Sequence, residues 1–338
     1  MIMSKIENNN PMTAEEVLRL RTVKAKSSEK PSAIEKLFNQ APAMETINGR
    51  TFPKGMKTIG MPMDEKTAEN RSLETDHFYP THADFEYNPK LEPKKDRKPK
   101  FIERDSFLTP ENARTIFGAD QRKVYNSTAY PWRCVGRVES SLGSGSGVMI
   151  GPRHLLTCSH IVDWKPNNTT GWLKFTPMYY NGSAPYGTAW GTLTYYKYKV
   201  AGPTIDSTEI QYDYVVIVLD RPIGNSTGWL GSKSYSDSWD GGAYWTHAGY
   251  PGDLTGTQRP TYQTGIALDG DFWSADDNES MSHKADIWPG QSGGPFWGYW
   301  DGSPYAVATQ SAHNPSDNFA SGGSDLVNLV IRARNEHP

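Results

Sequence analysis

The sequence predicts an all-β fold, a barrel or a sandwich, for residues 116–338, preceded by a poorly structured N-terminal region. From residue 116 onward, short runs of β-branched and aromatic residues alternate with Gly, Asn, Asp, Ser and Pro, the pattern of strands and turns. No long helical periodicity interrupts this pattern. The composition also divides there, because all 11 tryptophans follow residue 130. Many short strands with frequent turn signals are typical of all-β barrels and sandwiches.

Individual strands can be placed from these runs. The candidates are residues 135–138, 147–150, 172–175, 195–200, 214–219 and 305–309. Within residues 116–338, only the end has helical spacing, over residues 324–334. Leu326, Leu329, Val330 and Ala333 fall on one face of that helix.

Residues 1–115 lack such runs and are rich in Pro, Lys and Glu. One short helical signal begins at Thr13 and leads into Val17, Leu18 and Leu20, and Thr13 and Glu16 can form its capping box. The charged run at residues 94–100 is typical of a solvated linker. We therefore expect two parts, a leader and linker over 1–115 and one compact domain over 116–338, the first burying too little to fold alone.

Net charge, apolar runs and cysteine number limit the kinds of partner and cross-link that we expect. The 338 residues carry a net charge of −3, with no strongly basic part, so we expect no nucleic-acid partner. No run of 18 apolar residues exists, so we expect no membrane contact. The two cysteines, Cys134 and Cys158, are too few for a disulfide framework, which leaves one bridge or two buried thiols open.

Two signals on localisation oppose each other. The first ten residues, MIMSKIENNN, have no apolar core, so no signal peptide is visible. Seven glycosylation sequons favour a secreted glycoprotein, although Asn, Ser and Thr are simply abundant here. They begin at Asn70, Asn126, Asn167, Asn168, Asn181, Asn225 and Asn278.

Three segments supply the parts of a nucleophilic site. His160 follows an apolar strand, Asp213 stands at the start of a buried one, and Ser292 lies in the glycine-rich turn at residues 290–295. A Ser hydroxyl attacks well only when a base removes its proton, and a neutral imidazole does this near pH 7. The imidazole needs a carboxylate that holds its tautomer. We therefore predict Ser292 as nucleophile, His160 as general acid and base, and Asp213 as orienting carboxylate.

The glycines of the turn have their own role. A developing oxyanion needs backbone N–H donors that side chains do not block. We expect the amides of Gly290 and Ser292 to form this oxyanion hole. A Gly-x-Ser-x-Gly turn also occurs in α/β-hydrolases, but there the acid and the His follow the Ser. Here they precede it, and only 46 residues follow Ser292.

Residues 116–335 resemble the chymotrypsin-like serine proteases, most closely the secreted glutamyl endopeptidase branch. The matching stretches are 117–122, 131–133, 213–219, 249–253, 290–295 and the segment around His160. The resemblance implies two six-stranded antiparallel β-barrels with the active site between them, a C-terminal helix and a leader that is cut away.

The chain departs from that family at two places. Gln291 stands where zymogen-activated relatives carry the Asp that pairs with a newly freed N-terminus, so we do not expect trypsin-type activation. By alignment the substrate pocket contains Asp286, Ile287, Gln310, Ser311 and His313. The branch uses a hydroxyl and a late-strand His where this chain has Ile287 and Gln310. Glutamate specificity is therefore in doubt, and Asp286, at the place of trypsin's selector, is a weaker candidate for binding basic residues.

The sequence thus predicts a serine endopeptidase, made as a proenzyme, that needs no metal or other cofactor. Its expected partners are polypeptide substrates and its own pro-region, and we expect a monomer. Two alternatives remain: a catalytically silent protease fold that binds peptides, and an esterase or lipase using Ser292. A large helical content would favour the esterase.

Overall fold

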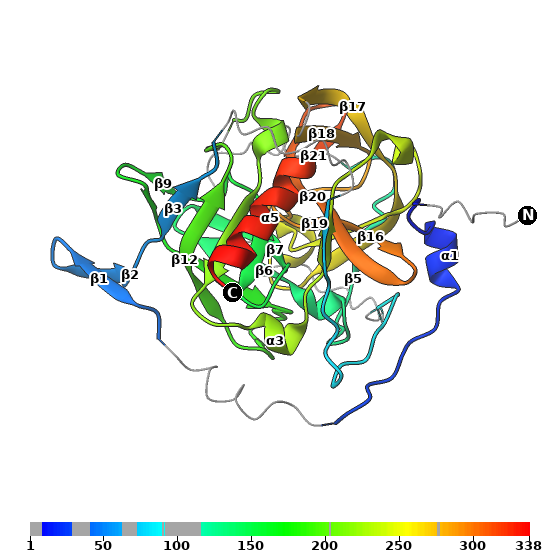
Figure 1. Cartoon of the computed structure of the whole chain (residues 1–338), viewed down its shortest axis with the longest axis horizontal. Helices are drawn as coiled ribbons and strands as arrows, with labels where there is room; N and C mark the ends of the chain where they lie inside the picture. The colour runs from blue at the N-terminus through cyan, green and yellow to red at the C-terminus, as the bar shows by residue number, and fades with distance from the viewer. Residues whose placement is uncertain are drawn as a thin grey trace, which may run out of the picture.

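The computed structural model describes residues 9–28, 41–62, 73–89, 91, 116–202, 204–275 and 278–338. Two β-sheets lie next to each other, and the C-terminal helix α5, Ser324–Glu336, runs along them (Figure 1). The helix contacts strands of both sheets, including β13, β14 and β18. The predicted all-β class and the predicted terminal helix are both confirmed.

The first sheet closes into a six-stranded antiparallel barrel. Its strands follow the order β11-β6-β7-β8-β13-β12, and β11 also pairs with β12. They are β6 Val135–Ser140, β7 Gly143–Met149, β8 His154–Thr157, β11 Leu173–Pro177, β12 Ala189–Tyr196 and β13 Val215–Leu219. Every residue of β13 is buried, because one face of the strand lines the barrel interior and helix α5 packs against the strand. Two short strands, β9 Trp164–Lys165 and β10 Thr169–Thr170, extend the same sheet.

The second sheet forms a half-barrel. Its order is β17-β18-β21-β20-β19-β15-β16-β5, with β14 paired to β20. The strands are β5 Lys123–Val124, β14 Gly231–Lys233, β15 Trp245–Gly249, β16 Thr261–Ile266, β17 Leu268–Ala275, β18 Asn278–His283, β19 Pro295–Trp300, β20 Ser303–His313 and β21 Asn318–Gly322. The pairings described here leave this ring open, whereas we expected a second closed barrel, because β16 and β17 follow each other in the chain without pairing.

Among the described residues, helices are short except at the C-terminus. They are α1 Ala14–Leu18, α3 Gly224–Thr227 and α4 Gly252–Thr255, with 3₁₀ turns η1 Trp132–Cys134, η2 Ile210–Tyr212 and η3 Asp237–Trp239. The four apolar residues predicted for one face of α5 are fully buried. Thr13 and Glu16 form the predicted capping box of α1.

Two strands of the N-terminal region join the two large sheets, and two others form a separate hairpin. Strands β1 Met44–Ile47 and β2 Arg50–Pro53 form a hairpin, and β3 Lys57–Gly60 runs parallel to β12. Strand β4, Glu74–Thr75, pairs with β14 of the second sheet. Composition alone hides β3 and β4, because each pairs with a strand from the second part of the chain and neither belongs to a sheet of the N-terminal region's own. The charged run at 94–100 lies outside the described residues.

The structure also bears on several smaller expectations from the sequence. Cys134 and Cys158 are both buried free thiols, so no bridge joins them. Asn278 is buried and hydrogen-bonded to Tyr214 and Asp325, which corrects its assignment as a glycan acceptor. Asn70 lies outside the described residues. No helix in the described part of the chain is long and apolar enough to span a membrane.

Candidate active site

His160 and Asp213 are brought together by neighbouring strands of the closed barrel. His160 follows the end of β8, and Asp213 lies between η2 and the start of β13. Strands β8 and β13 pair with Thr157 opposite Val215. The two segments that leave this edge of the barrel therefore start side by side.

The contact between the two side chains is an oriented hydrogen bond. His160 Nδ1 lies 2.7 Å from Asp213 Oδ2, and the His160 backbone N–H donates to Asp213 Oδ1 over 2.9 Å. The Asp213 side chain is fully buried, while the His160 side chain keeps 17% exposure. With its proton on Nδ1, a neutral His160 has a lone pair on Nε2, the form a general base needs.

A third donor to Asp213 comes from the other sheet. Ser311, on β20, donates its hydroxyl proton to Asp213 Oδ2 over 2.6 Å. We had assigned Ser311 to the substrate pocket, whereas the structure places its hydroxyl on the carboxylate. Nothing in the sequence signals this contact, because it joins two residues 98 positions apart. Three donors thus fix the position of the Asp213 carboxylate.

Ser292 lies on a turn shaped by two glycines with positive φ. Gly290 and Gly293 have φ values of +101° and +77°, the region that favours glycine. The Ser292 carbonyl accepts from the backbone N–H of Ser146 on β7 over 2.8 Å, and Gly293 N–H donates to Gln310 O over 2.8 Å. The turn is thus fastened to both sheets.

The turn lies beside the His160 segment. A side chain at Gly145 would come within 3.0 Å of the Ser292 carbonyl and 3.1 Å of Ile161 Cδ1. In this structure, however, His160 Nε2 faces Cys158 Sγ at 3.6 Å, and the half-buried Ser292 makes no hydrogen bond to the imidazole. The structure thus brings His160 and Asp213 into contact, and brings Ser292 to the same place without that last bond.

In this cluster both Cys158 and His160 bind a proton more tightly than they do free in water. Burial raises the pKa of Cys158, so the thiol keeps its proton and is at most a weak donor to His160. Burial by itself would lower the pKa of His160, but the Asp213 carboxylate outweighs it and raises that pKa above its usual value. His160 therefore holds a proton more strongly than a free imidazole does.

The predicted oxyanion donors belong to this turn. The Pro289 carbonyl accepts from Gly252 N–H over 2.9 Å, so in a planar trans peptide the Gly290 N–H points away from Gly252. The Gly290 carbonyl accepts from Ser146 Oγ over 2.8 Å. Within the described part of the chain, the N–H groups of Gly290 and Ser292 have no protein acceptor, as an oxyanion hole requires.

The predicted pocket residues separate into different environments. Asp286 is buried, and its two oxygens accept from the backbone N–H groups of Phe117 and Gln121 over 2.8 and 2.7 Å. That carboxylate is therefore already engaged within the protein. Ile287 is 5% exposed, and His313 lies at the exposed end of β20.

Gln310 belongs to a buried series of hydrogen bonds that the sequence does not predict. His283 Nδ1 accepts from Ala285 N–H, so its proton is on Nε2 and donates to Gln310 Oε1 over 3.0 Å. The Gln310 amide nitrogen then donates to Ala312 O over 3.2 Å. Burial lowers the pKa of His283 to about 3, so neither His283 nor Gln310 carries a charge at neutral pH.

One group in the described residues has ligand atoms close enough for a metal ion. These atoms belong to Cys158, His160 and Asp213 and lie within 4.8 Å of one another. The Asp213 oxygens already accept hydrogen bonds from His160 and Ser311, and His160 Nδ1 is engaged by Asp213. Only Sγ and Nε2 remain, and two ligands do not make a closed zinc site.

Comparison with known proteins agrees with this geometry. Residues 145–303 match the family described as "Trypsin-like peptidase domain". A glutamyl endopeptidase of Bacillus licheniformis is 33% identical over 190 residues, 56% of each chain, so the matched region spans about half of that relative. A protein of Bacillus subtilis strain 168 named "Extracellular metalloprotease" is 26% identical over 231 residues, covering 64% of this chain and 67% of that one.

A solved structure shares the fold of this chain. A solved "Glu endopeptidase" structure superposes with a TM-score of 0.53 and 21% identity, covering 65% of this chain and 99% of the other. Agreement at that identity shows the fold. Together with the sequence matches, it shows a chymotrypsin-like fold in the second part of the chain, where residues 145–303 match the trypsin-like peptidase domain.

Proposed function

We propose that this protein is a serine endopeptidase in which Ser292 is the nucleophile, His160 the general acid and base, and Asp213 the orienting carboxylate. The observation that carries the proposal is the 2.7 Å contact between His160 Nδ1 and the fully buried Asp213. A buried carboxylate that fixes one imidazole tautomer is costly to build, and it has a direct use in proton transfer.

The reaction needs no component beyond substrate and water. Ser292 Oγ attacks the peptide carbonyl while His160 Nε2 takes its proton, and Asp213 stabilises the imidazolium. The Gly290 and Ser292 amides bind the oxyanion. The imidazolium then protonates the leaving amine, which leaves an acyl ester on Ser292. Water, activated by the same Nε2, hydrolyses this ester.

The attacking geometry requires a small rearrangement. Nε2 lies against Cys158 Sγ in this structure, so the Ser292 hydroxyl must reach Nε2 when substrate binds. Catalytic hydrogen bonds are often long or misaligned before substrate arrives. This same feature favours a second candidate function, a silent protease fold that binds peptides. The all-β fold does not fit the esterase alternative.

We propose further that residues 1–115 act as a pro-region that assists folding. Met56, just before β3, is 1% exposed, and its sulfur accepts a hydrogen bond from Thr194 Oγ1 on β12 over 3.4 Å. Phe85 is also buried, and Trp132 donates its indole N–H to Glu86 O over 2.6 Å. A tethered segment that supplies core side chains stabilises the barrels at high effective concentration.

The remaining proposals concern setting and partners. We propose that the protein acts on polypeptides as a monomer outside the cell, in line with the word "extracellular" in the name of one relative. The cut that releases the pro-region is placed between Asn112 and Gly118. N-terminal sequencing of active material tests this, because fully active protein that still begins at Met1 and gains nothing on trimming would contradict it.

A fluorophosphonate probe separates the two candidate functions. The full-length chain and a chain lacking residues 1–115 are each treated with the probe, and labelled peptides are located by mass spectrometry. An endopeptidase is labelled on Ser292 and hydrolyses casein, while Ser292→Ala does neither. A correctly folded protein that binds peptides but is never labelled is the silent fold.

A further inference from the structure

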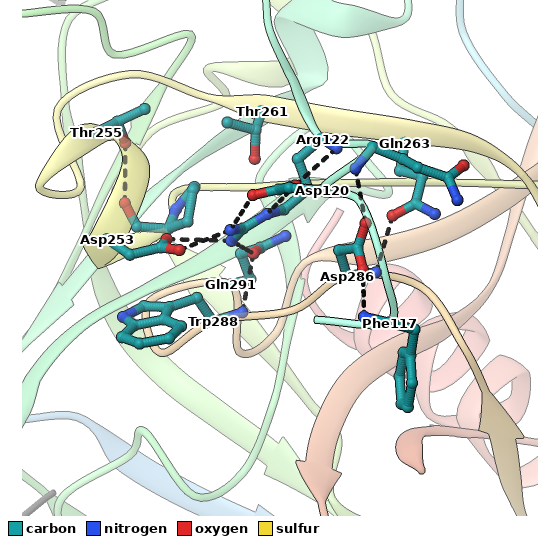
Figure 2. A network of polar contacts seen from close by, with 12 residues as sticks. Phe117, Asp120, Arg122, Asp253, Thr255, Thr261, Gln263, Asp286, Trp288 and Gln291 are labelled. Atoms are coloured by element: carbon teal, nitrogen blue, oxygen red, sulfur yellow. Dashed lines mark hydrogen bonds and ion pairs between the residues drawn. The ribbon is translucent and has the colours of Figure 1, made fainter. Parts of the chain in front are cut away.

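Arg122 is a buried side chain beside the turn that carries Ser292. It lies just before β5, and only 1% of its side chain is exposed. Figure 2 shows its guanidinium between the side chains of Asp120, Asp253 and Gln291. Neither the triad nor the pocket assigned above includes Arg122.

All five guanidinium N–H donors have an acceptor. Nε and Nη2 donate to the two oxygens of Asp120 over 3.0 and 2.8 Å. Nη2 and Nη1 also donate to the two oxygens of Asp253 over 2.6 and 3.1 Å. The second Nη1 proton goes to Gln291 Oε1 over 3.0 Å. Because a guanidinium is planar and its donors are fixed in direction, these bonds define the position of the Gln291 oxygen.

Gln291 passes this position on to the turn. Its side-chain oxygen also accepts from Trp288 N–H over 3.0 Å, while its backbone N–H donates to Trp288 O over 3.1 Å. The turn from Trp288 to Gln291 is therefore closed by two bonds. Gly290 lies inside this turn and Ser292 directly follows it, so their N–H groups, the proposed oxyanion donors, depend on its shape.

The same N-terminal segment holds the other end of the loop. Asp286 accepts from the backbone N–H groups of Phe117 and Gln121 (Figure 2). Asp253 belongs to the first turn of α4, whose first residue, Gly252, donates to Pro289 O. Residues 117–122, α4 and the loop 286–291 thus form one hydrogen-bonded unit.

We propose that Arg122 is a positioning residue that, through Gln291, holds the oxyanion turn in its working shape. The proposal rests on the serine-peptidase function proposed above. In trypsin-type relatives a freed N-terminus pairs with an Asp just before the nucleophile, whereas here a side chain from inside the chain bonds to Gln291. The turn therefore needs no new N-terminus, and the maturation cut must fall before Phe117 to keep both anchors.

A double-mutant cycle tests the coupling between the two residues. Gln291→Met keeps the side-chain length and removes the acceptor. We expect kcat to fall by about 10- to 100-fold, with KM within about threefold, because oxyanion contacts act in the transition state. Arg122→Met should lower kcat similarly, and adding Gln291→Met to it should cost less than about twofold more. Additive losses in kcat would overturn the proposal.

A matched control separates positioning from general destabilisation. Arg221 is as buried as Arg122, with 3% of its side chain exposed, and pairs with the adjacent Asp220 next to β13. Arg221→Met should lower the melting temperature and leave kcat of the folded protein within about twofold of wild type. If Arg122→Met does not fold, Arg122→Lys replaces it, since an ammonium cannot supply five donors in a plane. Equal effects of the Arg122 and Arg221 variants on kcat would contradict the proposal.

Hydrogen exchange gives a readout that does not depend on activity. In Gln291→Met, the amides of residues 286–294 should exchange at least about tenfold faster than in wild type, and in Arg221→Met they should not. If wild type lacks peptidase activity but this exchange changes as expected, the proposed function fails and the positioning role stands. Unchanged exchange in Gln291→Met overturns the positioning role even in an active enzyme.

Discussion

Asp213→Asn separates the tautomer of His160 from the packing around it. Asp213 Oδ1 accepts from His160 N–H, and Oδ2 accepts from both His160 Nδ1 and Ser311. In an asparagine, Oδ1 can still accept from the backbone, while the amide nitrogen takes the place of Oδ2. That nitrogen donates to Nδ1 and to the Ser311 oxygen, so the fold is retained but the imidazole proton must move to Nε2.

The expected loss in rate is large and the loss in stability small. With its proton on Nε2, His160 cannot accept the Ser292 proton, and the loss of this tautomer in a triad lowers kcat by about 10⁴-fold. That corresponds to about 5.4 kcal/mol in the activation barrier, at 1.36 kcal/mol per factor of ten. Replacing charge-assisted bonds by neutral ones should lower the free energy of unfolding by about 1–3 kcal/mol.

Peptide hydrolysis and thermal unfolding of the same preparations measure both quantities. Ser311→Ala is the matched control, because it removes one donor to Asp213 and leaves the tautomer in place. We expect it to cost much less in kcat than Asp213→Asn does. A folded Asp213→Asn protein with kcat within about tenfold of wild type would refute the assignment of Asp213.

Three further predictions concern pH, specificity and the leader. Because Asp213 raises the pKa of His160, kcat/KM should rise with pH and reach half its maximum above about pH 6.5, and a flat profile from about pH 5 to 9 would contradict this. The stability gained from that ion pair is fully present below the unfolded pKa of about 6.5 and is lost as the pH rises through the higher folded value. A peptide library should show no strict preference for Glu, since Gln310 and the neutral His283 offer no cation; a strict preference would instead point to His313. Met56→Ala should lower the free energy of unfolding of the full-length chain by about 2–5 kcal/mol in denaturant titrations, and an unchanged value would show that the leader does not contribute to the core.

The sequence predicted the features that local patterns determine. The buried strand Val215–Leu219 and the helix Ser324–Glu336 have the periodicity and composition of their class, and both form as expected. The glycines at 290 and 293 predict a tight turn, and both adopt positive φ. These features depend on residues close together in the chain, so their signal is present in the sequence.

Long-range contacts were beyond such reasoning. The bonds from Ser311 to Asp213, from His283 to Gln310 and from Arg122 to Gln291 each join residues that are far apart in sequence. No residue type or spacing in the sequence predicts these hydrogen bonds, because a polar residue at any of these positions would fit an exposed site equally well. The strands of the leader were missed for a related reason: β3 is short, and its stability comes from pairing with β12.

The most direct test of the account is the turnover of Ser292→Ala. The turn that carries this residue is hydrogen-bonded to both sheets, and the Ser292 hydroxyl forms the covalent bond in the proposed reaction. In a preparation free of contaminating proteases, with folding verified by thermal unfolding, kcat for a peptide substrate should fall by about a millionfold. A folded Ser292→Ala protein that kept more than about one percent of wild-type activity would contradict the nucleophile assignment and the mechanism built on it.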